Sequence, residues 1–379
     1  MKVSIVFGTR PEAIKLAPVI MRLLEVQWCA VRVVVTGQHD TMLKQVLEVF
    51  GIVPHRNLDI MRPDQSLCDV TTRALEGLDA EFRQHKSDLV IVQGDTTTTF
   101  VTALAAFYHQ IPVAHVEAGL RTHTKYAPFP EEINRVLTTH IADWHYAPTE
   151  RARQNLLREG IPADHVLVTG NTAIDALRWV VEQLDVRSAD ELKKLLSALP
   201  EDLIELCQQG RMILVTGHRR ENFGAGFERI CTALARLAEQ EPHVTFVYPV
   251  HLNPRVRQTV FHMLGQYPNI RLLDPLPYRE FAYLMRCAYL ILTDSGGIQE
   301  EAPALGKPVL VLREVTERPE AIEAGTARLV GTDVERIISA VRTLLYDESS
   351  YQAMAVARNP YGDGHAAERI VSHLERVLR

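Results

Sequence analysis

The strongest constraint on the fold is an alternation of short apolar runs with longer amphipathic segments along all 379 residues. Short runs with β-strand character are separated by segments whose apolar residues recur with helical spacing. Alternating strands and helices predict parallel sheets joined by right-handed crossovers. Nearly continuous apolar strands indicate that helices cover both faces of each sheet. The expected fold class is therefore α/β.

The expected strands fall into two sets. The first set covers residues 3–7, 31–36, 89–93, 113–116, 144–147 and 166–169, and the second covers residues 212–216, 244–247, 270–272, 289–292, 309–312 and 327–330. A charged helical tract, residues 175–209, separates the sets without a strand. We therefore predict two Rossmann-like domains, residues 1–170 and 171–363, with a C-terminal helix, residues 364–379, returning to the first. Such sheets bind ligands beyond the carboxyl ends of their strands, so a deep cleft between the domains is expected as the ligand site.

Composition argues against several classes of partner. A net charge of −6 argues against nucleic acid, and no apolar run approaches the roughly 18 residues of a membrane span. The N-terminal apolar run ends at Gly8, too early for a signal peptide, so the expected location is cytoplasmic. Five scattered cysteines, none in a CxxC pair, predict a reducing compartment without a disulfide framework or a zinc site: Cys29, Cys68, Cys207, Cys231 and Cys287.

One candidate phosphate site follows a strand in the second half. The strand ends in Asp294-Ser295-Gly296-Gly297, and helix-forming residues start at once. Glycines permit close approach of the backbone to a ligand, and free N–H groups at a helix start attract anions. Ser295, Gly296 and Gly297 are therefore candidate phosphate ligands, and Glu301, one helical turn further on, is placed to bind sugar hydroxyls. An ordinary strand-to-helix turn is the alternative for this segment alone.

Cations follow strands in both halves. The first strand ends in Gly8-Thr9-Arg10-Pro11-Glu12, and Lys15 follows in the predicted helix. Pro11 suits a first helical turn, so Arg10 and Lys15 lie beside a helix start, where they can bind an anion. A surface salt bridge is the alternative. In the second half, Glu317-Arg318-Pro319-Glu320 offers Arg318 as a further anion ligand.

Three carboxylates are candidates for acid/base chemistry. Asp95 and Glu117 each follow a strand, and Glu131 lies with Glu132 after a Pro-Phe-Pro segment. Burial at the carboxyl edge of a sheet can raise the pKa of a carboxyl group into the range needed for proton transfer. For Glu131 and Glu132, the alternative is a favourable interaction with the dipole of the helix that they begin. We expect Asp95, Glu117 and Glu131 to form a proton-transfer site.

Two histidine loops and several absent motifs complete the pattern. Gly217-His218-Arg219 follows a strand and places His218 where it can bond a phosphate or a leaving group, and His251 lies in a similar, weaker loop. No GxGxxG follows a strand, no P-loop is present, and no spacing suggests a metal site or a GxSxG serine nucleophile. The sequence therefore predicts no NAD and no metal cofactor.

Together and in this order, these motifs resemble the bacterial non-hydrolysing UDP-N-acetylglucosamine 2-epimerases, and the resemblance runs along nearly the whole chain. It rests on residues 8–12, 117–121, 128–135, 217–223 and 294–301 as a set. The resemblance implies a GT-B fold, two Rossmann-like domains with parallel sheets about a deep cleft. It also implies reversible conversion of UDP-N-acetylglucosamine to UDP-N-acetylmannosamine. In that reaction UDP leaves by anti elimination to give 2-acetamidoglucal, then adds again as a proton reaches the opposite face of C2.

The resemblance also assigns roles to individual residues. Asp95, Glu117 and Glu131 match the acid/base carboxylates, and His218 matches a residue that contacts the diphosphate. The remaining matches bind substrate: Arg10 and Lys15 the nucleotide-sugar, Ser295, Gly296 and Gly297 a phosphate, Glu301 the ribose, Arg318 the substrate, and Phe281 the uracil. Leu276 occupies a uracil-side position that is glutamine in some members. His123-Thr124-Lys125 stands where a small residue and an acidic one are expected, which admits an altered sugar substituent.

Family members also carry an activating second site for UDP-N-acetylglucosamine, and Gln38, His39 and His251 match it. The expected assembly is a homodimer, and the expected pathway supplies precursors of surface polysaccharide. Other readings remain open: a hydrolysing 2-epimerase that releases free N-acetylmannosamine, a 2-epimerase of a diacetamido-uronic acid nucleotide, a GT-B glycosyltransferase, or a UDP-sugar-binding protein without activity. Three cleft carboxylates argue against the binding protein, because binding alone does not require them.

Overall fold

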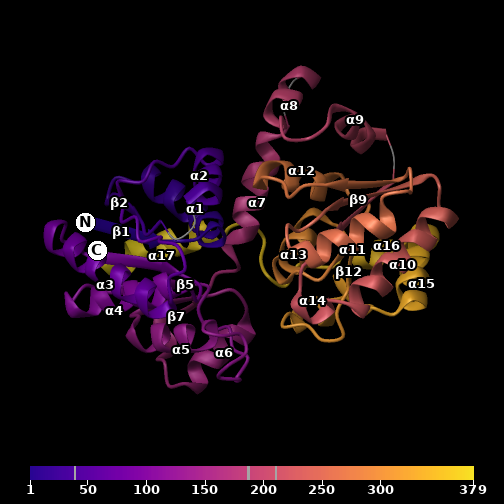
Figure 1. Cartoon of the computed structure of the whole chain (residues 1–379). Helices are drawn as coiled ribbons and strands as arrows, with labels where there is room; N and C mark the ends of the chain where they lie inside the picture. The colour runs from indigo at the N-terminus through magenta and orange to yellow at the C-terminus, as the bar shows by residue number, and fades with distance from the viewer. Residues whose placement is uncertain (38–39, 186–187, 210) are drawn as a thin grey trace. The chain divides into compact units, whose positions relative to one another are not determined.

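The computed structural model describes residues 1–37, 40–185, 188–209 and 211–379. The chain forms two compact units, the first made of Met1–Ala176 and Tyr361–Arg379 and the second of Leu177–Pro360 (Figure 1). One unit boundary falls within helix α7 (Thr172–Gln183), and the other falls shortly before the last helix. None of the described helices has the length and apolar character that a membrane span requires.

The first unit contains a seven-stranded parallel sheet in the order β3-β2-β1-β4-β5-β6-β7. Its strands are β1 (Lys2–Phe7), β2 (Ala30–Val35), β3 (Arg56–Asn57), β4 (Leu89–Gln93), β5 (Val113–Val116), β6 (Trp144–Ala147) and β7 (Val166–Val168). Its helices are α1 (Arg10–Glu25), α2 (Asp40–Val49), α3 (Leu67–Gln84), α4 (Thr97–Tyr108), α5 (Glu131–Ile141), α6 (Glu150–Arg158), the 3-10 helix η1 (Ala163–His165) and α17 (Ala366–Leu378).

The second unit contains a six-stranded parallel sheet in the order β10-β9-β8-β11-β12-β13. Its strands are β8 (Arg211–Thr216), β9 (Val244–Pro249), β10 (Ile270–Leu273), β11 (Leu290–Thr293), β12 (Val309–Val311) and β13 (Ala327–Leu329). Its helices are α8 (Ala189–Leu195), α9 (Glu201–Gln209), α10 (Ala225–Gln240), α11 (Pro254–Leu264), α12 (Tyr278–Cys287), α13 (Gly296–Glu301), α14 (Pro319–Glu323), α15 (Val334–Tyr346) and α16 (Glu348–Ala355), with 3-10 helices η2 (Arg220–Asn222) and η3 (Ala302–Leu305).

Burial and capping explain why these segments fold as they do. In β1, Val3, Ile5 and Val6 are fully buried, as expected for a strand covered on both faces. Helix α15 begins where the side chain of Asp333 accepts a hydrogen bond from the backbone N–H of Arg336 at 2.9 Å. Apolar residues spaced along one face of α15 then pack into the core of the second unit. The α/β fold class predicted from the sequence is confirmed.

The winding of each sheet reverses at one place. In the first unit the chain runs outward from β1 to β3 and then returns to β4, which pairs with β1. In the second unit the corresponding neighbours are β8 and β11. Such reversals separate the loops that follow the two central strands and leave a natural ligand site at the carboxyl ends. Two of the sequence motifs follow the central strands of the first unit, and two more follow those of the second.

Helix α17 belongs to the first unit and packs on α1. Leu374 is fully buried, and Nδ1 of His373 lies 3.2 Å from the hydroxyl of Tyr146. Trp144 contacts His373 edge-on, with ring centroids 5.4 Å apart. The backbone N–H of Ala367 donates to Asp175 Oδ1 at 2.8 Å, so the start of α17 is also fixed. The last helix is therefore part of the first unit's core.

Leu374→Ala should lower the free energy of unfolding of the first unit by about 3 kcal/mol, because it removes a buried side chain and leaves a cavity. Urea unfolding followed by tryptophan fluorescence measures this, since Trp144 lies against α17. The matched control is Leu24→Ala in α1, where the side chain is 60% exposed. Equal effects of the two substitutions would show that α17 contributes little to the core.

Candidate functional site

A buried carboxylate joins the two central loops of the first unit. Glu12 is 1% exposed, and one of its oxygens accepts hydrogen bonds from the backbone N–H groups of Gly8 at 3.1 Å and Thr9 at 2.7 Å. The other oxygen accepts from the hydroxyls of Thr96 at 2.7 Å and Thr99 at 3.1 Å. Burial raises the pKa of Glu12 despite these hydrogen bonds. The turn after β1 is thereby fastened to the turn after β4.

Glu117 follows β5 and is held from several sides. Lys15 Nζ donates to both carboxylate oxygens, at 2.5 and 2.7 Å, and Asn171 Nδ2 donates to Oε1 at 3.2 Å. The side-chain amide of Gln93 donates to Oε2. The backbone of Glu117 has a φ of 63°, a left-handed conformation that is unfavourable for residues other than glycine. A nearly buried carboxylate on strained backbone is typical of a functional position.

Asp95 follows β4 and lies in the same group of charges. Its carboxylate pairs with Arg135 at 2.7 Å, and its side chain is 28% exposed. Burial raises the pKa of Asp95; Arg135 opposes that shift, whereas the carboxylates of Glu117 and Glu131 add to it. The three predicted acid/base residues therefore lie close enough to interact electrostatically, and Lys15 belongs to the same cluster.

The structure distinguishes the two neighbouring glutamates at the start of α5. Glu132 is 3% exposed, and its oxygens accept hydrogen bonds from the backbone N–H groups of Thr122 at 3.1 Å and His123 at 2.9 Å. Glu132 therefore holds the loop that contains His123-Thr124-Lys125, where the sequence differs from the residues expected for the family. Glu131 has one buried oxygen without a hydrogen-bond partner in the described part of the chain. This unpaired oxygen distinguishes Glu131 from Glu132, whose oxygens are satisfied by backbone N–H groups.

In the second unit, Asp294 has the same role that Glu12 has in the first. The side chain is fully buried and accepts hydrogen bonds from the backbone N–H groups of His218 at 3.0 Å and Arg219 at 2.9 Å. Asn222 Nδ2 donates to it at 3.3 Å, and His218 Nδ1 lies 3.2 Å away. Burial alone raises the pKa of Asp294, but the hydrogen bonds from His218 and Arg219 outweigh it and lower the pKa. Asp294 thus fixes the His218 loop beside the glycine turn.

Two arginines flank the glycine turn after β11. A Cβ at Gly296 would lie 3.7 Å from Nη2 of Arg219 and 3.8 Å from the guanidinium of Arg318. Arg318 donates through Nε to the buried carboxylate of Glu300, which fixes its orientation. Glu301 reaches back toward the turn, because its Oε1 lies 3.8 Å from a Cβ at Gly297. Two cations beside the start of a helix can bind an anion such as a phosphate.

The remaining predicted residues lie on neighbouring elements. Arg10 is the first residue of α1. His251 follows β9 and stacks on His218 with ring centroids 5.8 Å apart; burial and the nearby His218 lower its pKa. Leu276 lies in the loop before α12, and Phe281 lies within that helix. Gln38 and His39 lie outside the described residues.

Several site residues were not assigned a role from the sequence. Arg135 and Asp294 lie within sequence motifs that contain candidate site residues, and that position was the only indication that they have a role in the site. Gln93 and Asn171 gave no signal, because amides that bind a carboxylate have no spacing rule. The structure identifies four of them through a contact with a predicted residue: Gln93, Arg135, Asn171 and Asp294. It identifies Glu12 through the hydrogen bonds that join the turns after β1 and β4.

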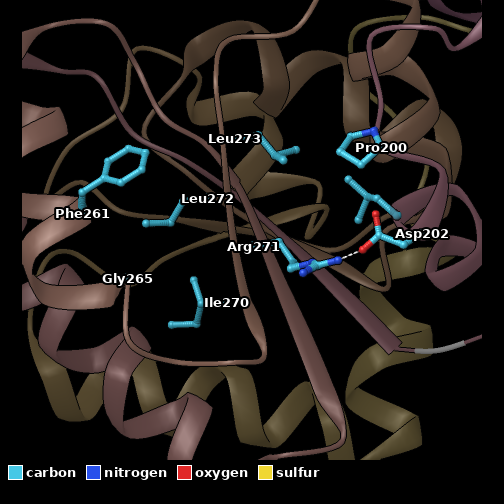
Figure 2. A pocket seen from close by; sticks show the side chains of 9 residues that line it. Pro200, Asp202, Phe261, Gly265, Ile270, Arg271, Leu272 and Leu273 are labelled. Carbon is cyan, nitrogen blue, oxygen red and sulfur yellow. Dashed lines mark ion pairs between the residues drawn. The ribbon is translucent and has the colours of Figure 1, made fainter.

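The second unit also contains a separate pocket of about 460 Å³, and none of these loops lines it. Figure 2 shows the residues that line it, which come from α9, α11, β10 and the flanking residues Pro200 and Gly265. Most of these side chains are apolar, and Arg271 and Asp202 form an ion pair. None of the predicted site residues lines it. Among the described residues, no cluster of three histidine, cysteine or acidic side chains could hold a metal ion.

Two doubly wound parallel units with charged loops at both reversals define an α/β protein of the GT-B type. Comparison with known proteins gives the family. A sequence model of UDP-N-acetylglucosamine 2-epimerase matches residues 22–375. The chain therefore belongs to the UDP-N-acetylglucosamine 2-epimerase family, as the sequence motifs predicted, and the GT-B fold is confirmed.

Individual relatives are similar along their whole length. The chain is 56% identical to UDP-N-acetylglucosamine 2-epimerase of Escherichia coli K12 over 375 residues, which covers 99% of this chain and 98% of the relative. The structure of UDP-GlcNAc 2-epimerase from Neisseria meningitidis bound to UDP-GlcNAc matches with a TM-score of 0.90 at 48% identity, covering 99% and 100% of the two chains. The S. aureus MnaA–UDP co-structure matches with a TM-score of 0.86 at 46% identity, covering 100% and 96%.

Asp294→Asn should destabilise the second unit by about 1–3 kcal/mol at pH 7, because buried N–H groups lose a charged acceptor. The folded-state pKa of Asp294 lies below its ordinary value of 3.8, so its contribution is complete above 3.8 and is lost as the pH falls through the folded value. The difference from wild type should therefore stay constant from pH 7 to 5 and shrink below about pH 4. Chemical denaturation at each pH measures it, with the exposed Asp190→Asn as control. A difference that grows on acidification would contradict this linkage.

Proposed function

We propose that this protein interconverts UDP-N-acetylglucosamine and UDP-N-acetylmannosamine by reversible epimerisation at C2. The observation that carries the proposal is the carboxylate cluster of the first unit, in a chain that is 56% identical to a UDP-N-acetylglucosamine 2-epimerase. Epimerisation moves a proton off one face of C2 and delivers one to the other face. Two acid/base groups in different environments suit that task better than one.

The proposed chemistry proceeds by elimination and addition. A carboxylate removes the C2 proton, the C–H electron pair forms the C1=C2 double bond of 2-acetamidoglucal, and the C1–O electron pair leaves with UDP. UDP then attacks C1 while a proton is delivered to the opposite face of C2. Departure of UDP gives C1 oxocarbenium character and acidifies the C2 hydrogen, so this scheme uses neither NAD nor a metal ion.

Within the first unit we assign the acid/base roles to Asp95, Glu117 and Glu131. Lys15 compensates the charge of Glu117 and fixes both oxygens, so its role is to position that carboxylate as well as to attract the anionic substrate. The raised pKa of Asp95 suits it to hold a proton near neutral pH better than an ordinary aspartate would. Arg10, the first residue of α1, would supply a further cation for the anionic substrate.

Within the second unit we assign the nucleotide to the loops at the β8–β11 reversal. Ser295, Gly296 and Gly297 would bind a phosphate. Arg318 would neutralise charge on the diphosphate as it leaves, and His218 would hydrogen-bond to it. Glu301 would bind the ribose, and Phe281 and Leu276 the uracil. Fixed cations are well suited to this role, because charge on the diphosphate grows in the transition state.

The proposal extends to regulation and assembly. We infer a second UDP-N-acetylglucosamine site that uses Gln38, His39 and His251, and a homodimer in the cytoplasm. The support for these points is the family resemblance and, for His251, its stacking on the proposed catalytic histidine, His218. Binding next to His218 would give an activator direct access to the leaving-group site.

Glu117→Gln and Asp95→Asn should each lower turnover by on the order of 10²–10⁴-fold and leave UDP affinity largely unchanged, because acid/base groups act mainly in the transition state. Product formation followed by proton NMR and UDP binding measured by calorimetry separate the two effects. The matched control, Glu76→Gln on the exposed surface of α3, should keep wild-type turnover. A parallel loss of UDP affinity in both site variants would make these residues binding groups.

Reaction in deuterium oxide should place deuterium at C2 of both epimers, because a carboxyl group exchanges its proton with solvent after UDP has left. Proton NMR of the same sample reports free sugar. A hydrolysing enzyme would accumulate free N-acetylmannosamine and UDP, whereas the proposed enzyme reaches a mixture of two UDP-sugars. Product without solvent deuterium would contradict the elimination mechanism.

A further inference from the structure

Asn171 lies beside the two segments through which the chain leaves and re-enters the first unit. The chain leaves this unit after Ala176, within α7, and returns at Tyr361. The backbone N–H of Asn171 donates to the carbonyl oxygen of Tyr361 at 2.7 Å. The preceding residue packs closely as well, because a Cβ on Gly170 would lie 3.2 Å from the Cα of Gly362. The backbone of Asn171 is therefore fixed between both segments, and the residue is only 2% exposed.

The side-chain amide of Asn171 has one orientation that satisfies its neighbours. The backbone N–H of Ala173 donates to Oδ1 at 2.9 Å, a contact in which only the amide oxygen can be the acceptor. The amide nitrogen therefore points the other way, where Nδ2 donates to Oε1 of Glu117 at 3.2 Å. An exchanged amide would place an N–H against the N–H of Ala173 and an oxygen against a carboxylate. Asn171 thus presents a fixed hydrogen-bond donor to Glu117.

The hydrogen bonds to Glu117 described above come from nitrogen donors. Lys15 donates to both oxygens, whereas Gln93 donates to Oε2 and Asn171 to Oε1. Such donors favour the ionised carboxylate, because a proton on either oxygen would face another donor instead of an acceptor. This arrangement suits a group that begins the reaction without a proton.

Two further ionisable groups interact with Glu117 electrostatically. Asp95 is a second carboxylate, and the charge on Glu117 adds to the rise in the pKa of Asp95 that burial causes. His115 lies two residues before Glu117, on β5, and burial lowers its pKa to about 3, so this imidazole is neutral near pH 7. Lys15 is the cation in contact with Glu117. Asn171 adds a donor to this group without adding a charge.

We propose that Asn171 is a positioning residue for Glu117, which it holds ionised and in one orientation for transfer of the C2 proton. The inference rests on the proposed function of this site. Lys15 can follow the carboxylate into other rotamers, because its side chain is long and flexible. Asn171 cannot, because Ala173 fixes its amide and Tyr361 fixes its backbone. The rigid donor therefore selects one rotamer of Glu117 before the substrate binds.

Asn171→Asp in the full-length protein keeps the oxygen that accepts from Ala173 and replaces the donor with a carboxylate oxygen. We expect kcat to fall by about 10- to 100-fold with KM for UDP-N-acetylglucosamine nearly unchanged, because the change misplaces a group that acts in the transition state. The acid limb of the kcat profile should also move to higher pH, since a second negative charge disfavours ionisation of Glu117. Product formation followed by proton NMR over a pH series measures these effects.

Asn57→Asp is the matched control, because Asn57 is exposed and its Oδ1 also accepts a backbone N–H two residues further on, from Asp59 at 3.1 Å. This variant should keep the wild-type kcat, KM and pH profile. Asn171→Ser should lower kcat and move the acid limb less, because it removes the donor without adding a charge. Wild-type kcat in both Asn171 variants, a loss confined to KM, or an unmoved acid limb in Asn171→Asp would overturn the proposal.

A double-mutant cycle tests the contact without relying on activity. Asn171→Asp should lower the urea midpoint of unfolding, and it should do so less in a Glu117→Gln background, because the introduced amide can donate to the introduced carboxylate. Equal losses in the two backgrounds would overturn the proposal. Wild-type protein that forms no UDP-N-acetylmannosamine, with the coupling present, would instead contradict the proposed function and leave the contact between Asn171 and Glu117 established.

Discussion

Buried carboxylates that accept backbone N–H groups hold the loops at the reversal of each sheet. Glu12 fastens the turn after β1 to the turn after β4, and Asp294 fixes the loop after β8 beside the turn after β11. A loop at the end of a buried strand has N–H groups that no sheet partner satisfies, and leaving them buried and unpaired would cost free energy. One acidic side chain satisfies several of them at once. The positions of the proposed site residues depend on these two anchors.

The pKa values of the two anchors shift in opposite directions, although burial raises both, and their hydrogen-bond donors explain the difference. At Glu12 the desolvation of the carboxyl group exceeds the effect of its hydrogen bonds, and the pKa rises. At Asp294 the side chain of His218 adds to the backbone donors, and the pKa falls. A raised pKa means that ionisation costs stability, whereas a lowered pKa means that it contributes stability. The second loop therefore depends on the charge of its anchor.

A protein with a net charge of −6 must attract an anionic substrate by local rather than overall charge. The structure supplies that local charge through cations with fixed orientation. Arg318 is held by Glu300, and Lys15 is held against Glu117. Fixed cations pay little reorganisation cost when charge develops on a leaving group.

The sequence by itself determined the α/β class, nearly all strands and the motifs at their carboxyl ends, because apolar periodicity and turn residues act locally. It did not predict β3, since Arg56 and Asn57 are exposed and carry no strand pattern. Only the tertiary structure decided which of Glu131 and Glu132 is satisfied by backbone N–H groups, and that Lys15 contacts Glu117. Contacts between distant residues depend on how helices pack on the sheets, and no local pattern records that packing.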